Sequence, residues 1–161
     1  MRRVSAGVLV ALTVAGAAQA ADLPLERRSA PRRADQGAAT LILTATGDDA
    51  GSLRFTCDRA SGDISVSPEV AIKGFKAGDP TAITLESPGG RAVVAARIVH
   101  DKRSGDMRAM GKLSRSAGLV RLLTRGTRLD VEVADKFLSV PLNRRNRDAL
   151  ARFRAQCPSL R

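Results

Sequence analysis

The two cysteines of the chain, Cys57 and Cys157, lie far apart in sequence, and each falls on an apolar face. Phe55 and Cys57 belong to an alternating segment that predicts a strand, whereas Leu150, Phe153 and Cys157 follow the spacing of one helix face. Two cysteines allow one intramolecular pairing, so we expect a Cys57–Cys157 disulfide that ties a strand to a C-terminal helix. In the chain-entropy model, closing a loop of about 100 residues stabilises a fold by about 4–5 kcal/mol.

A redox-active or intermolecular thiol pair is the alternative, but the chain has no C-x-x-C motif.

A structural disulfide persists mainly in oxidising compartments, and the first 20 residues predict export to one. Arg2 and Arg3 precede the apolar run 4–18, and Ala18-Gln19-Ala20 is a cleavage signal that predicts processing after Ala20. The run is shorter than the ~20 residues of a spanning helix, and no other long apolar run follows, so we expect a periplasmic or secreted protein without a transmembrane segment. An uncleaved anchor and a twin-arginine route are the alternatives.

Beyond this signal, residues 21–39 combine proline with charge and predict a flexible leader, and residues 40–161 predict a single domain. That domain is mainly β, with about eight strands at short spacing, one short helix and a C-terminal helix. The pattern favours an antiparallel β-sandwich or a partly open barrel, with the last helix held by the disulfide. We expect strands at 41–43, 52–57, 63–67, 83–86, 91–99, 107–113, 129–133 and 136–142, and helices at 117–123 and 144–156.

One short pattern occurs twice: D-R-A-S-G-D-I at 58–64 is similar to D-K-R-S-G-D-M at 101–107. A duplicated hairpin unit would explain it, as would two loops that present the same polar surface. The segments on either side do not repeat, so we favour a third interpretation, in which Ser-Gly-Asp turn chemistry is used twice.

The inventory of side chains excludes several kinds of site. The chain has one His, no Trp and no Tyr, so a zinc site of His and Cys lacks ligands and base stacking on Tyr or Trp is excluded. We expect no cofactor and no metal. A hydrolytic triad would have to use His100, but His100 and Asp101 are neighbours in a strand and point to opposite faces. An envelope hydrolase using His100 is therefore kept as an alternative to a non-catalytic protein.

Charge is the clearest functional signal. The formal net charge is +11, and most of the excess lies in the second half of the domain. A basic surface there predicts binding to an anionic lipid, a polysaccharide or an acidic protein, and export argues against a nucleic-acid partner. Because Arg greatly outnumbers Lys, composition bias is the competing explanation. The residues expected to bind are Arg144, Arg145, Arg147, Arg152 and Arg154 of the last helix, with Arg103, Arg108, Lys112, Arg115, Arg121 and Arg125.

The end of the chain reads "GLVRLLTRG", then "TRLDVEV", then "KFLSVPLNRRNRDALARFRAQC". This order of a short helix, two strands and a helix that ends in a cysteine is similar to the invasion-associated locus B type of small Gram-negative exported proteins. It also resembles the VasI-type secretion accessories. The resemblance covers roughly the last 45 residues and rests on a hydrophobic pattern. It implies a periplasmic β-sandwich with a structural disulfide, and a structural or accessory role in an envelope or secretion system, but it assigns no functional residues.

Overall fold

The computed structural model describes residues 37–45, 51–113 and 117–160. Within these ranges eight strands form a single antiparallel sheet, accompanied by two α-helices and a short 3-10 helix. The strands are β1 (Ala38–Thr44), β2 (Ser52–Asp58), β3 (Ile64–Pro68), β4 (Pro80–Ser87), β5 (Gly90–His100), β6 (Met107–Leu113), β7 (Arg128–Val133) and β8 (Lys136–Pro141). The helices are α1 (Ala117–Thr124), α2 (Arg144–Gln156) and the 3-10 helix η1 (Pro158–Leu160).

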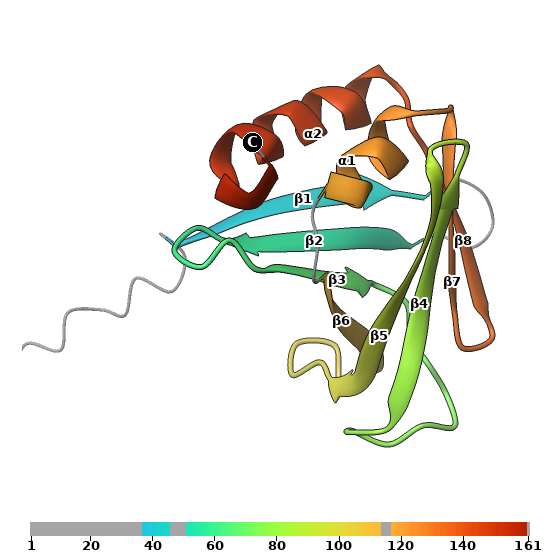
Figure 1. The fold of residues 1–161 in the computed structure, drawn as a ribbon. Coiled ribbons are helices and arrows are strands. Elements are labelled where there is room, and N and C mark those ends of the chain that lie inside the picture. The colour runs from blue at the N-terminus through green and yellow to red at the C-terminus, as the bar shows by residue number, and fades with distance from the viewer. Residues whose placement is uncertain (1–36, 46–50, 114–116, 161) are drawn as a thin grey trace, which may run out of the picture. The chain divides into compact units, whose positions relative to one another are not determined.

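The strands are arranged in the order β1-β2-β3-β6-β5-β4-β7-β8, and every neighbouring pair is antiparallel. The sheet curls into a half-barrel: β1, β2 and β3 run across the view in Figure 1, and β4, β5, β7 and β8 cross them steeply. Of the two expected architectures, the partly open barrel is the one found. The mainly β class, the eight strands and the two helices are confirmed.

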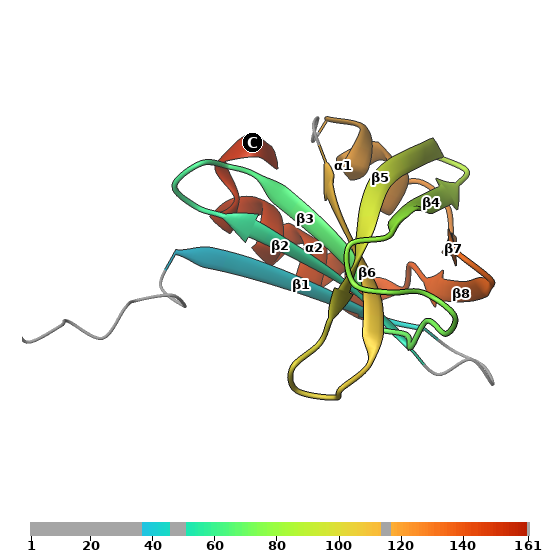
Figure 2. The same cartoon turned by 90° about the horizontal axis from the view of Figure 1, so that it is seen from below.

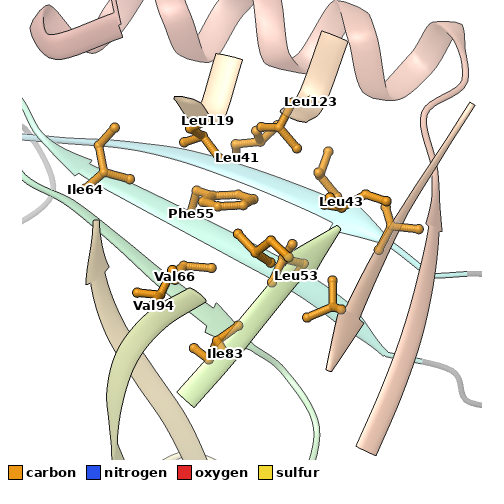
Figure 3. Close-up of a cluster of buried hydrophobic side chains, with 14 of the residues drawn as sticks. Leu41, Leu43, Leu53, Phe55, Ile64, Val66, Ile83, Val94, Leu119 and Leu123 are labelled. Carbon is orange, nitrogen blue, oxygen red and sulfur yellow. The ribbon is translucent and has the colours of Figure 1, made fainter. Parts of the chain in front are cut away.

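Alternation of apolar and polar residues decides which face of each strand is buried. In β2, Leu53, Phe55 and Cys57 are fully buried, while the side chains between them are partly exposed. The same alternation in the other strands fills the concave face of the curled sheet with aliphatic side chains, as Figure 3 shows around Phe55. The outward positions carry mostly polar and charged residues, together with a few exposed hydrophobic side chains such as Val93 and Phe137.

Both helices lie on the concave side of the sheet. Leu119 and Leu123 of α1 point toward Leu41 and Phe55 and complete the core (Figure 3). Helix α2 runs along β1 and covers that edge of the sheet (Figures 1 and 2). It begins where the sequence predicts, because the side chain of Asn143 accepts a hydrogen bond from the N–H of Asn146 at 3.0 Å. None of the described helices is long and apolar enough to cross a membrane.

The two similar sequence segments adopt the same loop. In the β2–β3 loop, the N–H of Gly62 donates to the carbonyl of Asp58 at 2.8 Å, and in the β5–β6 loop, that of Gly105 donates to Asp101 at 2.8 Å. Both aspartate carboxylates accept backbone N–H groups further along their loop, and both glycines have positive φ. The flanking strands differ in length and partners, so the repeat is one turn chemistry used twice.

Some expectations differ from the structure or fall outside it. Strand β1 begins at Ala38 and Ala39 is buried, so the sheet starts two residues before the domain boundary expected at residue 40. Strand β4 begins at Pro80, because the pairing with β5 continues past the alternating residues. The predicted export signal, the predicted leader up to residue 36 and Arg115 lie outside the described residues.

Candidate functional site

The disulfide joins the sheet to the C-terminal helix. Cys57 of β2 and Cys157, the residue that follows α2, are bonded, with Cα atoms 5.8 Å apart. Both residues are fully buried, as the apolar faces predicted. Both cysteines of the chain are therefore held in a structural bond in the core, and it fixes the end of α2 against the sheet.

We give the name helical basic surface to six exposed arginines on the two helices or directly after α1. Arg121 lies in the last turn of α1 and Arg125 directly follows that helix. The remaining members come from α2, where they lie away from the buried Leu150 and Phe153. The members are Arg121, Arg125, Arg144, Arg145, Arg147 and Arg152, all exposed.

Arg147 links the two helices within this surface. Its Nε donates to the carbonyl of Leu142 at 2.9 Å, and its Nη2 donates to the carbonyl of Gly126, just after α1, at 3.0 Å. Gly126 has a φ of 90°, which allows the chain to turn after α1. The Arg147 guanidinium therefore has a structural role, and it holds the end of α1, with Arg125, beside the first turns of α2.

The helical basic surface differs from the sheet in how its charge is balanced. Among the described residues, every ion pair joins residues of strands or of the loops between them, and none includes a residue of α1 or α2. Asp148 is the single acidic residue within α2. The positive charge of the helices is therefore not neutralised by ion pairs within the described part of the fold.

Three of the predicted residues lie elsewhere, because the strand order carries them to the convex face of the sheet. Lys112 is exposed on β6, Arg103 is exposed in the β5–β6 loop, and Arg108 is partly buried on β6. Arg154 is on α2, but its Nε lies 3.5 Å from the carbonyl of Leu160 at the end of the chain, a long distance for a hydrogen bond. The predicted basic residues are thus divided between two surfaces.

Arg108 is the centre of an ion-pair network on the convex face. Its Nη1 lies 2.8 Å from Oδ2 of Asp101 and 3.8 Å from Oε1 of Glu69, and its Nη2 donates to the hydroxyl of Ser104 at 3.2 Å. Its Nε is buried and has no hydrogen-bond partner among the described residues. These contacts join the β5–β6 loop to the segment that follows β3.

Glu69 joins this network to β2. Arg54 donates from Nε to Oε1 of Glu69 at 2.7 Å, its Nη2 lies 2.5 Å from the same oxygen, and the hydroxyl of Ser52 donates to the other oxygen. Partial burial opposes ionisation of Glu69, but these hydrogen bonds and the charges of Arg54 and Arg108 outweigh it and lower the pKa of Glu69. Glu69 is therefore held as a carboxylate.

Asp101 is likewise held in its ionised form. The backbone N–H of Arg103 donates to its carboxylate at 2.8 Å, and this bond lowers the pKa of Asp101 against a smaller effect of desolvation, with further lowering by the charge of Arg108. The network thus contains two carboxylates and two guanidiniums that neutralise one another.

His100 ends β5 and is exposed, as expected for a histidine at a strand end. Among the described residues, His100 donates no hydrogen bond to a carboxylate. The carboxylate of Asp101 accepts the backbone N–H of Arg103 and pairs with Arg108. His100 lines a hollow together with Glu69 and Asp101, but both carboxylates are paired with arginines, so an envelope hydrolase using His100 stays an alternative prediction. The described residues contain no group of three or more His, Cys, Asp or Glu side chains placed to hold a metal ion.

Sequence reasoning missed Arg54 and Glu69. Both are outward residues at the β2–β3 hairpin, where Arg54 pairs with Ser67, so the hairpin register was a signal that could have brought them together. Arg108 reaches them only because β6 pairs with β3, a contact between segments far apart in sequence. No local sequence pattern therefore indicates that Arg108 contacts Glu69.

Comparisons with protein-family models, with curated proteins and with solved structures found no match for this chain. The resemblance of the last third to the invasion-associated locus B and VasI types therefore stays a prediction.

Proposed function

We propose that this is an exported, non-catalytic domain that binds an anionic component of the cell envelope through the helical basic surface. The observation that carries the proposal is the concentration of arginines on α1 and α2 without ion pairs among the described residues. Cations that are not neutralised within the fold attract anionic ligands over several ångströms and raise the rate of association.

The placement of Arg144 and Arg145 supports a role in binding. Both lie in the first turn of α2, which contains no acidic residue. The positive end of the helix macrodipole disfavours cations there, by about 0.3–1 kcal/mol for each exposed charge. Arg144 and Arg145 therefore destabilise the start of α2 when no ligand is bound. An anion bound between them would offset the repulsion between their charges and the positive end of the helix.

The absence of apolar anchors on the described helices indicates how binding works. The exposed large hydrophobic side chains lie on strands or in the β3–β4 loop. The large apolar residues of α2, Leu150 and Phe153, are buried in the core. Contact is therefore electrostatic and sensitive to salt, without insertion into the acyl region of a membrane.

The proposed periplasmic or secreted location is supported by the predicted export signal of residues 1–20 and by the disulfide, which is typical of oxidising compartments. The resemblance of the C-terminal segment points the same way, to the periplasm and to a role in an envelope or secretion system. An acidic protein is the competing partner, and the test below separates it from a lipid surface.

Sedimentation with vesicles tests this proposal. The mature chain should pellet with vesicles of phosphatidylglycerol and phosphatidylcholine, should not pellet with phosphatidylcholine alone, and should be released as salt is raised. Soluble poly-glutamate should compete only weakly with the vesicles; strong competition together with weak vesicle binding would replace the lipid surface by an acidic protein.

Two variants with the same change in net charge locate the binding surface. Arg144→Gln with Arg145→Gln should lower the vesicle-bound fraction severalfold, whereas Lys102→Gln with Arg103→Gln, on the convex face, should leave it close to wild type. The proposal is overturned if the two variants lose binding equally, because net charge alone would then explain retention.

A further inference from the structure

A hollow of about 640 Å³ opens on the convex face of the sheet, on the side away from the helices. It lies over β2, β3, β5 and β6 and is bordered by the β5–β6 loop, which is found below β1, β2 and β3 in Figure 1 and at the lower edge of the molecule in Figure 2. Sites for small molecules commonly have volumes of about 300–1,000 Å³. We call this feature the convex hollow; its location is independent of the helical basic surface.

Part of the hollow is apolar. Met110 and Val99 both line it, and Met110 is 47% exposed between the outward charged residues Arg108 and Lys112 of β6. A flexible thioether adapts to apolar groups of different shape. These two side chains provide a surface that the apolar body of a ligand would cover.

The hollow carries a net positive charge. Its two carboxylates, Glu69 and Asp101, are already paired with Arg54 and Arg108 in the network described above. The other charged or titratable groups that line it are Lys102, Arg103 and His100, and no ion pair of these three is found among the described residues. A ligand therefore meets an excess of cations beside the apolar patch.

The loop that carries Lys102 and Arg103 is held in place. Asp101 accepts from the N–H of Arg103 at 2.8 Å and from that of Gly105 at 2.8 Å, and the side chain of Arg108 contacts both Asp101 and Ser104. Because these contacts already order the loop, the loop loses little conformational freedom when a ligand binds, and the entropy cost of association is lower.

We propose that the convex hollow binds a small amphiphilic anion, namely a single carboxylate or phosphate head on a short apolar body. The head lies against Lys102 and Arg103, and the body covers Met110 and Val99. The ion-pair network of Arg54, Glu69, Arg108 and Asp101 acts as the wall that fixes the loop. This site is separate from the helical basic surface, so either proposal can fail without the other.

Calorimetric titration of the mature chain with octanoate tests the site. Octanoate should bind, acetate should bind at least about tenfold more weakly because it lacks the body, and octylamine, with the same body and the opposite charge, should not bind. Octyl phosphate in place of octanoate distinguishes a preference for a phosphate head. Binding of octylamine as tight as that of octanoate would show an apolar patch without charge recognition and would overturn the proposal.

Two variants in the hollow and one control variant on α2 test where octanoate binds. Lys102→Gln with Arg103→Gln, and separately Met110→Gln, should each weaken octanoate binding by about threefold to tenfold. Arg144→Gln with Arg145→Gln, which removes the same charge from the helices, should leave the affinity unchanged. Absence of octanoate binding to the folded chain, or equal weakening by the helical pair, contradicts the assignment.

Discussion

Asp58 and Asp101 occupy the same position in two copies of one loop, but the two loops have different neighbours. The Asp58 loop lies against the C-terminal end of the chain, where Arg59 donates to the side chain of Gln156 at 2.6 Å. The Asp101 loop instead borders the convex hollow, where the carboxylate of Asp101 pairs with Arg108. The same local chemistry therefore supports the disulfide-linked terminus in one place and a candidate ligand site in the other.

The two loops allow a matched test of local strain. Gly62 and Gly105 have φ values of 77° and 80°, a region that costs an L-residue about 1–2 kcal/mol. A Cβ on Gly105 would meet nothing within 4 Å, whereas one on Gly62 would lie 3.3 Å from Cβ of Ser159. In urea denaturation, Gly105→Ala should lose about 1–2 kcal/mol of unfolding free energy, and Gly62→Ala should lose more. Equal losses would mean that the Gly62 loop does not support the C-terminus.

The disulfide should supply a large share of the stability. Replacing both Cys57 and Cys157 by alanine should lower the free energy of unfolding by at least about 4 kcal/mol, because the unfolded chain regains the freedom of a long open loop. Wild type with the bond reduced, verified by mass spectrometry, should show a loss of similar size in chemical denaturation. A reduced protein as stable as the oxidised one would contradict this role.

The ion-pair network should make stability depend on pH on the acid side. Since the pKa of Glu69 is lower in the folded chain than its ordinary value of about 4.3, ionised Glu69 stabilises the fold. This contribution is present above the ordinary value and disappears as the pH falls through the lowered folded value. Glu69→Gln should lower the free energy of unfolding at pH 7 by about 1 kcal/mol or more. Between neutral and acid pH, the free energy of unfolding of this variant should fall less than that of wild type. A variant with the same pH dependence as wild type would refute the role of Glu69.

Features of the fold that depend on neighbours in sequence could be predicted. Alternation around Phe55 predicted β2, and the spacing of Leu150 and Phe153 predicted α2. The pairing of Cys57 with Cys157 followed because the chain offers no other cysteine. Each of these inferences used only local pattern or simple counting.

The candidate site could be predicted only in part, because it depends on strand order. The pairing of β3 with β6 brings Arg108 to Glu69, and no local pattern determines which distant strands become neighbours. The same pairing places Lys112 on the convex face, apart from the arginines of α2. A charge count along the sequence therefore indicated a basic half of the domain, while the division into two surfaces required the fold.

We propose that the helical basic surface, and not net charge alone, holds an anionic partner. Amide resonances of the isotope-labelled mature chain, recorded with and without nanodiscs that contain phosphatidylglycerol, test it most directly. We predict selective line broadening in α1 and in the first two turns of α2, near Arg125 and Arg145, with little change in residues 102–112. Broadening centred on residues 102–112, or spread evenly over the whole sheet, would contradict the account.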